Sequence, residues 1–449
     1  MKAQDQKIVI CGGMRTPIGH FARSLANYSA SELMRLAVES TIKKVGVKKE
    51  DVDGLFVGWV GQDFNAPNLA RVTLLNSGLP EKAQAATLQN NCISSIEAVS
   101  MAARCILAGE GSLYIAGGTE AMSRLPYSIS GSRAADELRS FDVVKEKWGE
   151  LIGNDNVTVV DAMEQGLTDP VKGINMAATA EVCAQLRGIS REDQDNFAYQ
   201  SFKRSVEGWE AGFYNDHVEP IKDGDTVILD KDEYPHLRIN LVKKPKMFSK
   251  SPALFDNSKY PIADFFRDFG KFMDGKSSPN GNCGTVTLFN ACGRSDGAAA
   301  IVVTTEARAK ELGLPIAAEL KSWGYYGNDP AHMGVSPALA TPVALERAGI
   351  QFADLDQIEL HEPFAATVLG IFKDGKEKFG HDWQAKYDSG ALNPNGGSIS
   401  IGHPLGATGI RLVLNLLESL KRNDKSRLGL AAACAGGGMG GALVVEKLA

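Results

Sequence analysis

The sequence lacks several features that mark common classes of protein. No apolar run approaches the roughly 20 residues that a membrane-spanning helix needs, and the polar stretch before residues 8–11 shows no signal-peptide pattern. Basic residues number 48 against 54 acidic ones, and the net charge of −6 argues against a surface for nucleic acid or anionic membranes. These absences predict a protein with no transmembrane segment and no nucleic-acid partner, located in the cytoplasm.

Cysteine pairs are also missing, because the 7 cysteines are scattered and never arranged as Cys-x-x-Cys. This spacing predicts reduced thiols rather than a disulfide framework or a zinc site, so we expect no metal. The sequence contains no phosphate-binding loop of the Gly-x-x-x-x-Gly-Lys-Ser/Thr type and no Gly-x-Ser-x-Gly turn. A formal dinucleotide fingerprint at Gly436, Gly438 and Gly441 leads into a strand-like stretch rather than a helix, which argues against a nucleotide site.

Predicted strands and helices alternate along much of the chain, which is typical of a layered α/β fold. The alternation stops between about residues 123 and 293, where the chain is more polar and carries long aperiodic stretches. We therefore divide the chain into the first part of an N-terminal unit, an inserted loop domain, the end of the N-terminal unit and a C-terminal unit. The predicted bounds of these four parts are 1–122, 123–293, 294–313 and 314–449.

The two units resemble each other. Residues 50–57 precede the predicted strand, turn and helix around Cys92, and the similar stretch 353–360 precedes those around His403. Internal duplication explains this similarity most economically. Packing of the two copies about a pseudo-twofold axis would bring Cys92 and His403 together.

The insertion carries one strong helix signal and one aromatic-rich segment. Ser190 followed by Asp193 predicts a capped helix start. Seven aromatic residues gather between Phe248 and Phe272. This segment has two interpretations, a small satellite core or a wall that holds an acyl chain.

Two cysteines and a histidine stand in turns where chemistry is favoured. Cys92 is predicted at a helix N-terminus, which stabilises a thiolate, and its backbone N–H could hold an oxyanion. His403 is expected between a short strand and a helix, where Pro404 suits the first helical turn. Cys434 ends an apolar strand and enters a glycine-rich turn that a substrate can approach closely. A histidine packed beside a turn is the plainer interpretation of His403, but the three residues together favour acyl transfer.

Short sequence blocks follow one another along nearly the whole chain. The blocks begin at Arg15 (Arg-Thr-Pro-Ile-Gly), Asn91 (Asn-Cys-Ile-Ser-Ser), Gly117 (Gly-Gly-Thr-Glu-Ala-Met-Ser), Gly173 (Gly-Ile-Asn-Met-Ala-Ala), Ser295 (Ser-Asp-Gly-Ala-Ala-Ala), His361 (His-Glu-Pro-Phe), Gly396 (Gly-Gly-Ser-Ile-Ser-Ile-Gly-His-Pro) and Cys434 (Cys-Ala-Gly-Gly-Gly-Met-Gly). In this order they resemble the blocks of the thiolase family. The resemblance implies a five-layer αβαβα fold built from two duplicated units with an inserted loop domain. It also implies a homodimer or tetramer and coenzyme A as a substrate, with no separate cofactor.

The same resemblance implies roles for individual residues. Cys92 would be the acylated nucleophile, His403 its base, and Cys434 the acid and base at the α-carbon of the substrate. The N–H groups of Cys92 and Gly436 would form one oxyanion hole. His361 and His403, together with a water, would form the other.

Three positions depart from the commonest thiolase pattern. His361 stands where many thiolases have asparagine, as in β subunits of fatty-acid oxidation complexes, which implies a hydratase/dehydrogenase α subunit as a partner. Met176 lies in an Asn-Met-Ala block where short-chain enzymes have His-Met-Gly, and Cys292 stands where a serine is common. We expect Met176, Cys292 and Phe364 to bind substrate.

These features predict thiolytic cleavage of 3-oxoacyl-CoA to acetyl-CoA and a shortened acyl-CoA. Three alternatives are an acetoacetyl-CoA-specific biosynthetic thiolase, a 3-oxoacyl synthase-like condensing enzyme and a non-catalytic acyl-CoA-binding protein. The length of the acyl chain stays open.

Overall fold

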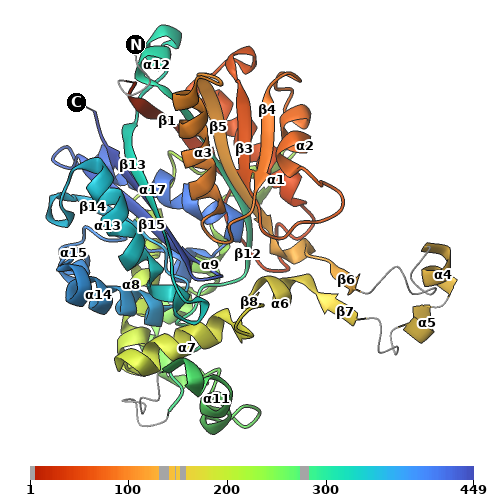
Figure 1. Cartoon of the computed structure of the whole chain (residues 1–449), viewed down its shortest axis with the longest axis vertical. Coiled ribbons are helices and arrows are strands. Elements are labelled where there is room, and N and C mark those ends of the chain that lie inside the picture. Colours follow the sequence, from red (N-terminus) through yellow and green to blue (C-terminus); the bar gives the residue numbers. More distant parts are fainter. Residues whose placement is uncertain (1–5, 131–140, 147, 152–157, 274–282, 449) are drawn as a thin grey trace.

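A ten-stranded sheet runs through the centre of the computed structural model, which describes residues 6–130, 141–146, 148–151, 158–273 and 283–448 (Figure 1). The strand order is β14-β15-β16-β13-β1-β12-β5-β3-β4, and the short β2 pairs with β12. The strands are β1 (Ile8–Arg15), β2 (Gly19–His20), β3 (Gly54–Gly58), β4 (Gln84–Leu88), β5 (Leu113–Ala121), β12 (Ser295–Thr305), β13 (Ala318–Gly327), β14 (Gln357–Leu360), β15 (Leu428–Ala435) and β16 (Met439–Glu446).

The sheet consists of two halves with the same strand directions. In the first half β3 lies parallel to β4 and β5, and β5, β12 and β1 follow one another antiparallel. In the second half β14 lies parallel to β15, and β15, β16 and β13 follow antiparallel. Within the sheet, the described residues of the two halves pair through β1 and β13, where Val9 lies opposite Glu319 and Ile10 opposite Ala318. The predicted duplicated α/β architecture is therefore confirmed.

Helices form three layers around these two halves. The central layer consists of α3 (Ser94–Ala108) and α17 (Thr408–Arg422), which pack against each other and against strands of both halves. The outer layers consist of α1 (Ala30–Val45) with α2 (Leu69–Asn76) on the first half, and α13 (Ser336–Ala348) with α14 (Ala365–Phe379) on the second. This is the predicted αβαβα order.

The central helix α3 is almost entirely small and apolar, because it is buried between the two halves. Residues 91–108 are long and apolar enough to cross a membrane by length and composition, yet 61% of this stretch is buried inside the protein. Its C-terminal Gly109 adopts φ 78°, the left-handed conformation that ends many helices. Packing in the core therefore accounts for the apolar character of α3.

The start of α17 and the turn before it lie close to α3 and β5, and two glycines permit this approach. A Cβ atom on Gly406 would lie 2.5 Å from the backbone oxygen of Thr119, and one on Gly409 would lie 2.7 Å from the side chain of Ile96. The N–H of Ile410 donates a hydrogen bond of 3.1 Å to Ser95 Oγ of α3. The corresponding turns of the two units thus come together.

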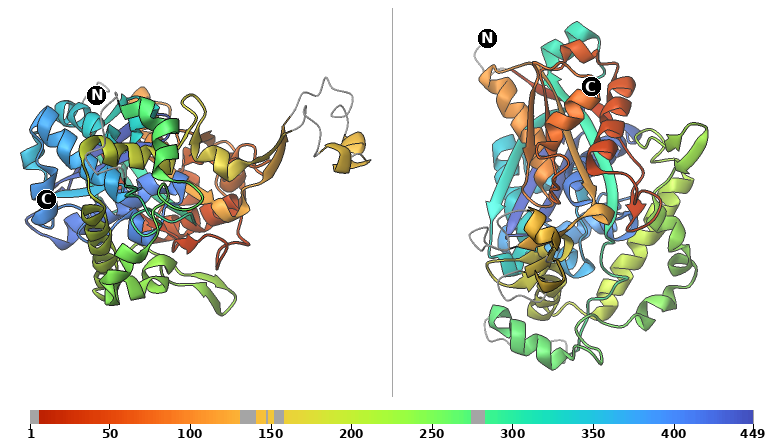
Figure 2. Two further views of the ribbon diagram at one scale, coloured as in Figure 1. Left: turned by 90° about the horizontal axis from the view of Figure 1, so that it is seen from below. Right: turned by 90° about the vertical axis from the view of Figure 1, so that its right-hand side faces the viewer.

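The chain between β5 and β12 forms helices beside the second half and a projecting hairpin. The hairpin of β6 (Tyr127–Ser130) and β7 (Thr158–Asp161) extends away from the body, with α4 (Phe141–Glu146) and α5 (Trp148–Leu151) beyond it (Figure 2). The remaining elements of this part are α6 (Ala162–Gly166), β8 (Thr168–Asp169), β9 (Ile174–Asn175), α7 (Met176–Arg187), α8 (Arg191–Glu210), β10 (Ile221–Asp223), β11 (Thr226–Leu229), α9 (Glu233–Leu237), α10 (Ile239–Lys243) and α11 (Ile262–Phe269). Ser190 caps α8 by accepting the N–H of Asp193, as predicted. Residues 131–140, 147, 152–157 and 274–282 of the predicted insertion lie outside the described part, and the four domain boundaries stay a prediction.

Six of the seven aromatic residues in the aromatic-rich segment pack into a satellite core, whereas Phe248 packs into the large core of the second unit. Phe255 and Phe265 are buried with ring centroids 5.1 Å apart, and they pack with apolar residues of α7 such as Val182. None of the seven aromatic residues lines the cavity that contains Cys92, although Leu254 of the same segment does. The satellite-core interpretation is therefore favoured.

Three local predictions at the catalytic turns are wrong. Pro404 precedes the 3₁₀ turn Leu405–Ala407 rather than standing in a first helical turn, and α17 begins only at Thr408. The stretch before His403 forms the short helix α16 (Ser398–Ile401) rather than a strand, and all four of its residues are buried. Because both polar and apolar residues are buried there, their alternation carries no information about the exposed face. Helix α3 begins at Ser94, two residues after Cys92, because Asn90 and Cys92 form a tight turn first.

Candidate active site

A cavity of about 270 Å³ opens where the two units meet, and the predicted site residues line it. They come from turns, helix starts and the end of strand β15, which are distant in the sequence, and the fold brings them together. Those in the cavity wall are Cys92, Met176, Cys292, His361, Phe364, His403 and Cys434. Gly436 lines a neighbouring cavity of about 410 Å³, which shares Met122, Met176 and Leu405 with the first.

The turn that carries Cys92 is held in an unusual backbone conformation. Asn91 adopts φ 47°, which asparagine tolerates better than most residues with a side chain. Its Nδ2 donates a 2.8 Å hydrogen bond to the carbonyl of Gly436, and the N–H of Asn90 donates to Ser94 Oγ at 2.8 Å. These contacts fix Cys92 beside the glycine turn that follows Cys434.

Cys92 is a neutral thiol in this setting. Loss of water contacts raises its pKa to about 12, and the carboxylate of Glu120 contributes to the rise. The N–H groups of Gly436 and of Cys92 itself lower the pKa, but by less. The expected stabilisation of a thiolate at the helix start is therefore outweighed by desolvation, and the thiol needs a base when it reacts.

His403 is placed to act as that base. Its Nε2 lies 3.1 Å from Cys92 Sγ, and its Nδ1 lies 2.7 Å from Thr408 Oγ1. The Thr408 hydroxyl donates its only proton to the carbonyl of Pro404 at 2.9 Å, so it must accept from Nδ1–H. The lone pair of Nε2 therefore faces the thiol. Burial, with Arg411 as a second cause, lowers the pKa of His403 to about 3, so the ring is neutral.

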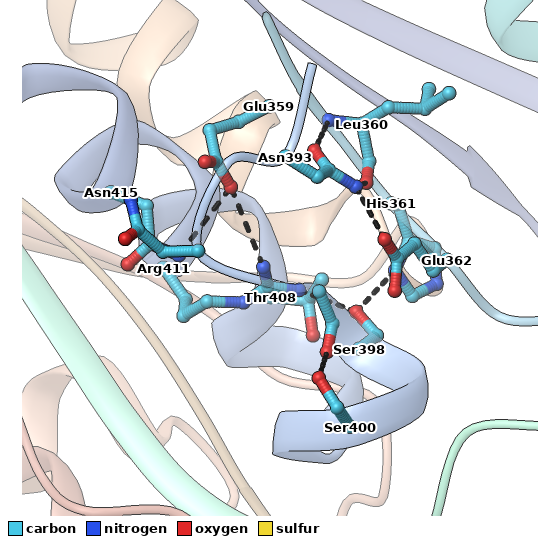
Figure 3. A network of polar contacts seen from close by, with 12 residues as sticks. Glu359, Leu360, His361, Glu362, Asn393, Ser398, Ser400, Thr408, Arg411 and Asn415 are labelled. Carbon is cyan, nitrogen blue, oxygen red and sulfur yellow. Dashed lines mark hydrogen bonds and ion pairs between the residues drawn. The ribbon is translucent and has the colours of Figure 1, made fainter. Parts of the chain in front are cut away.

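His361 lies against His403, with ring centroids 4.2 Å apart and an angle of 45° between the planes. Its Nδ1 is 2.8 Å from Ser398 Oγ (Figure 3). Its Nε2 is buried and has no hydrogen-bond partner within the described part of the protein. Burial, then His403 and Arg411, hold the pKa of His361 well below its usual value, so this ring is also neutral.

The turn after His361 is fixed by its buried neighbour Glu362. The Glu362 carboxylate accepts hydrogen bonds from Ser201 Oγ at 2.6 Å and from Asn393 Nδ2 at 2.7 Å. Asn393 also accepts the N–H of Leu360 at 2.8 Å (Figure 3). The backbone on either side of His361 is therefore tied to the segment that leads to His403.

Cys434 supplies a second thiol to the cavity and is 1% exposed. Burial raises the pKa of Cys434 well above its usual value, and the neighbouring thiols Cys92 and Cys292 raise it further. All seven cysteines lie in the described part of the chain, and none of them forms a disulfide. Three thiols thus approach one another at this site in the reduced state.

Several residues that shape the site escaped the sequence analysis. Glu120 accepts the N–H groups of Gly61 at 2.9 Å and Gly406 at 3.1 Å, and so ties the loop after His403 to the first unit. Burial raises the pKa of Glu120 to about 7 despite these hydrogen bonds. Thr408 and Arg411 were overlooked as well. A charged residue inside the apolar helix α17 was the available signal for Arg411.

The ligand atoms of Cys92, His361 and His403 lie within 4.8 Å of one another. Thiolate and imidazole are also the ligands of zinc sites. The sequence-based expectation that no metal binds here stays a prediction.

A half-buried thiol beside a buried imidazole, with a second thiol in the same cavity, suits the transfer of acyl groups, and we assign the chain to the acyltransferases. Residues 8–251 match the family description "Thiolase, N-terminal domain" and residues 314–447 match "Thiolase, C-terminal domain". The chain belongs to the thiolase family. The predicted family, five-layer fold and acyltransferase class are confirmed.

Relatives and solved structures match over almost the whole chain. An acetyl-CoA acetyltransferase of Syntrophomonas wolfei is 33% identical over 448 residues, which cover 99% of this chain and 100% of the relative. One of Chromobacterium violaceum is 36% identical over 446 residues, covering 98% of this chain and 100% of the relative. The crystal structure of human mitochondrial 3-ketoacyl-CoA thiolase in complex with CoA superposes with a TM-score of 0.82 at 29% identity, covering 99% of this chain and 98% of that one.

Proposed function

We propose that this thiolase cleaves 3-oxoacyl-CoA with coenzyme A and that Cys92 carries the acyl group. The observation that carries the proposal is the 3.1 Å contact between Cys92 Sγ and the unprotonated Nε2 of His403. A neutral thiol becomes nucleophilic when a base in hydrogen-bond contact takes its proton as it attacks. The coenzyme A bound to the human relative supports coenzyme A as a substrate here.

In the first half-reaction, Cys92 sulfur attacks the 3-oxo carbon while its proton moves to His403. The bond between the α-carbon and the 3-oxo carbon then breaks, which leaves the acyl group on Cys92 and the enolate of acetyl-CoA. The thiol of Cys434 gives its proton to the α-carbon of this enolate and becomes a thiolate. Acetyl-CoA then leaves.

In the second half-reaction, Cys434 takes the proton of an incoming coenzyme A thiol, and the coenzyme A sulfur attacks the acyl-Cys92 thioester. Collapse of the tetrahedral intermediate releases the shortened acyl-CoA, and the Cys92 sulfur recovers its proton from His403. Both thiols and the imidazole return to their starting states, so the cycle needs no oxidant or metal.

Two sets of hydrogen-bond donors would hold the negative oxygens. The N–H groups of Cys92 and Gly436 are proposed for the oxyanion formed during attack by Cys92 or by coenzyme A; their effect on the Cys92 pKa supports this placement. His361 Nε2 is proposed for the thioester oxygen of the enolate, with His403 as its partner once His403 is protonated. The unpartnered, buried Nε2 supports the proposal for His361.

Met176, Cys292 and Phe364 line the cavity, which supports a substrate-binding role for each. The second cavity beyond Met122 and Leu405 offers space for a longer acyl chain. An acetoacetyl-CoA-specific biosynthetic enzyme is the alternative substrate assignment. A homodimer or tetramer, a hydratase/dehydrogenase α subunit as partner and a cytoplasmic location stay predictions.

Acyl labelling tests the nucleophile. After incubation with acetyl-CoA, the peptide that contains Cys92 should gain the mass of one acetyl group, and Cys92→Ser should not be labelled through sulfur. The label confined to Cys434, or no label on any peptide, would overturn the assignment. A series of 3-oxoacyl-CoA chain lengths, assayed with free coenzyme A, would separate the general degradative activity from an acetoacetyl-CoA-specific one.

A further inference from the structure

His361 can stabilise a negative oxygen only if its cavity-facing nitrogen carries a proton. A neutral imidazole has one N–H and one lone pair, and the partner of the other nitrogen decides which is which. Nε2 faces the cavity without a protein partner in the described part, so the choice depends on Nδ1 and its neighbour Ser398.

Ser398 sits between the histidine and a buried cation (Figure 3). Its hydroxyl oxygen lies 2.8 Å from His361 Nδ1 and accepts a hydrogen bond from Nη2 of Arg411. Ser398 is fully buried at the start of α16, and Arg411 is 1% exposed on α17. These are the hydrogen bonds of the Ser398 hydroxyl among the described residues.

Among the described residues, Ser398 is the hydrogen-bond acceptor of the Arg411 guanidinium. Its Nε and Nη1 are buried without hydrogen-bond partners in the described parts of the chain. Glu359 lies 3.9 Å from Nη1, at the limit of an ion pair, and this carboxylate is also contacted by Asn415 Nδ2 at 3.4 Å. Ser398 Oγ is therefore the acceptor that orients the guanidinium.

Donor counting then selects one tautomer. A guanidinium only donates, so Ser398 Oγ must accept from Arg411, and the hydroxyl proton is left for His361 Nδ1. In the opposite tautomer Nδ1–H would donate to the same oxygen, and the Ser398 proton would point into a buried region with no acceptor. A buried unsatisfied donor is costly, and donation by a cation makes a hydroxyl a stronger donor in turn.

We propose that Ser398, oriented by Arg411, is a positioning residue that holds the proton of His361 on Nε2, ready to donate to the enolate oxygen of the substrate. The proposal rests on the role of His361 given under the proposed function. Ser398 touches neither the substrate nor the reacting sulfur and acts only through His361.

A double-mutant cycle tests this role. Ser398→Ala should lower kcat about 10- to 100-fold, since losing one oxyanion donor costs about 10²–10³ and a mixture of tautomers retains part of it. The KM for coenzyme A should stay within about twofold, because the binding surface is unchanged. In a His361→Asn background the same substitution should change kcat by less than about threefold, because an amide carries N–H groups in every state.

The cycle also separates positioning from structural damage. Ser398→Ala leaves Arg411 without its acceptor in both backgrounds, so a purely structural loss would appear equally in both, and equal losses would overturn the proposal. Ser400→Ala is the matched control on the same short helix, because its hydroxyl bonds to Ser201 and to the Gly397 carbonyl. It should keep nearly wild-type kcat.

Nitrogen chemical shifts of the histidine rings give a readout that does not depend on activity. In wild-type protein labelled with ¹⁵N-histidine, the resonances lost in His361→Asn should show a proton on Nε2, and Ser398→Ala should shift them towards a mixture. A wild-type proton on Nδ1 would overturn the proposal. Absence of thiolytic activity would overturn the proposed function instead, while the ring tautomer could still be read.

Discussion

His361 and His403 share one cavity, with ring centroids 4.2 Å apart, yet their neighbours prepare them for opposite tasks. Nδ1 of each ring forms a hydrogen bond with a hydroxyl group, that of Ser398 for His361 and that of Thr408 for His403. Thr408 gives its proton to the carbonyl of Pro404 and so accepts from His403, which leaves a basic Nε2 towards Cys92. Ser398 accepts a hydrogen bond from the Arg411 guanidinium and so donates its own proton to Nδ1 of His361. The proton of His361 is therefore left on Nε2, which can act as a hydrogen-bond donor.

The comparison teaches that the second partner of a hydroxyl decides what a histidine can do. The two rings are chemically identical, both are buried, and both have lowered pKa values. The base and the donor differ because one hydroxyl meets a carbonyl and the other meets a guanidinium. Tautomer control of this kind needs no charge on either ring.

Removal of the base should have the largest effect. His403→Ala should lower kcat by about 10²–10⁴, the usual contribution of a general base, and should slow acetyl labelling of Cys92 in the same proportion. Single-turnover labelling with acetyl-CoA measures the acylation step directly. A variant that still acylates Cys92 at the wild-type rate would break the comparison, because His403 would then not be the base.

Removal of the hydrogen-bond donor His361 should lower kcat by somewhat less. His361→Ala should lower kcat by about 10²–10³, as for loss of one oxyanion donor, while His361→Asn should retain much more activity. Steady-state thiolysis of acetoacetyl-CoA by the two variants measures the difference. Equal activity of the alanine and asparagine variants would mean that His361 is structural.

Loss of the Thr408 hydroxyl, which orients the base His403, should have an intermediate effect on kcat. Thr408→Val keeps the shape of the side chain but leaves His403 free to adopt either tautomer and without a partner that orients the ring. The tautomer mixture costs about twofold and the lost orientation adds to it, so kcat should fall about 10-fold, much less than for a full tautomer reversal. The matched control is Thr73→Val on α2, because the Thr73 hydroxyl is equally buried and has no hydrogen-bond partner in the described part. If both variants keep wild-type turnover, Thr408 does not set the tautomer.

The smallest expected effect concerns stability at low pH. The pKa of His361 is lowered on folding, so the unfolded chain binds a proton below about pH 6.5 that the folded protein refuses. The contribution of the neutral His361 ring to the free energy of unfolding is present above about pH 6.5 and is lost as the pH falls. Relative to wild type, His361→Asn should therefore gain about 1–2 kcal/mol between pH 7.5 and pH 5. Urea unfolding at the two pH values measures this gain, and an unchanged difference would show that His361 is protonated in the folded state.

Much of the fold could be predicted from local sequence patterns. Ser29 and Gly46 cap α1, and Ser190 caps α8, because capping depends on residues within one turn of the helix end. The similarity between 50–57 and 353–360 predicted the duplication because corresponding strands face the same layers. Patterns failed at α16, where burial on every side removes the contrast between exposed and buried faces.

The residues of the candidate site could be predicted from the sequence, but their protonation states and tautomers could not. Cys92, His361, His403 and Cys434 stand in recognisable turns, whereas the direction of each hydrogen bond depends on partners far along the chain. Ser398 and Arg411 are 13 residues apart and meet His361 only through folding of the second unit. The desolvation that keeps Cys92 a neutral thiol likewise comes from the assembled cavity.

The contact between Cys92 and His403 joins residues 311 positions apart, one from each unit. A polypeptide emerges from the ribosome in sequence order, so the first unit can fold well before the second has been made. During that interval the base of the finished site, His403, has not yet been synthesised. The thiol–imidazole pair is therefore complete only after the second unit has been made and has packed against the first.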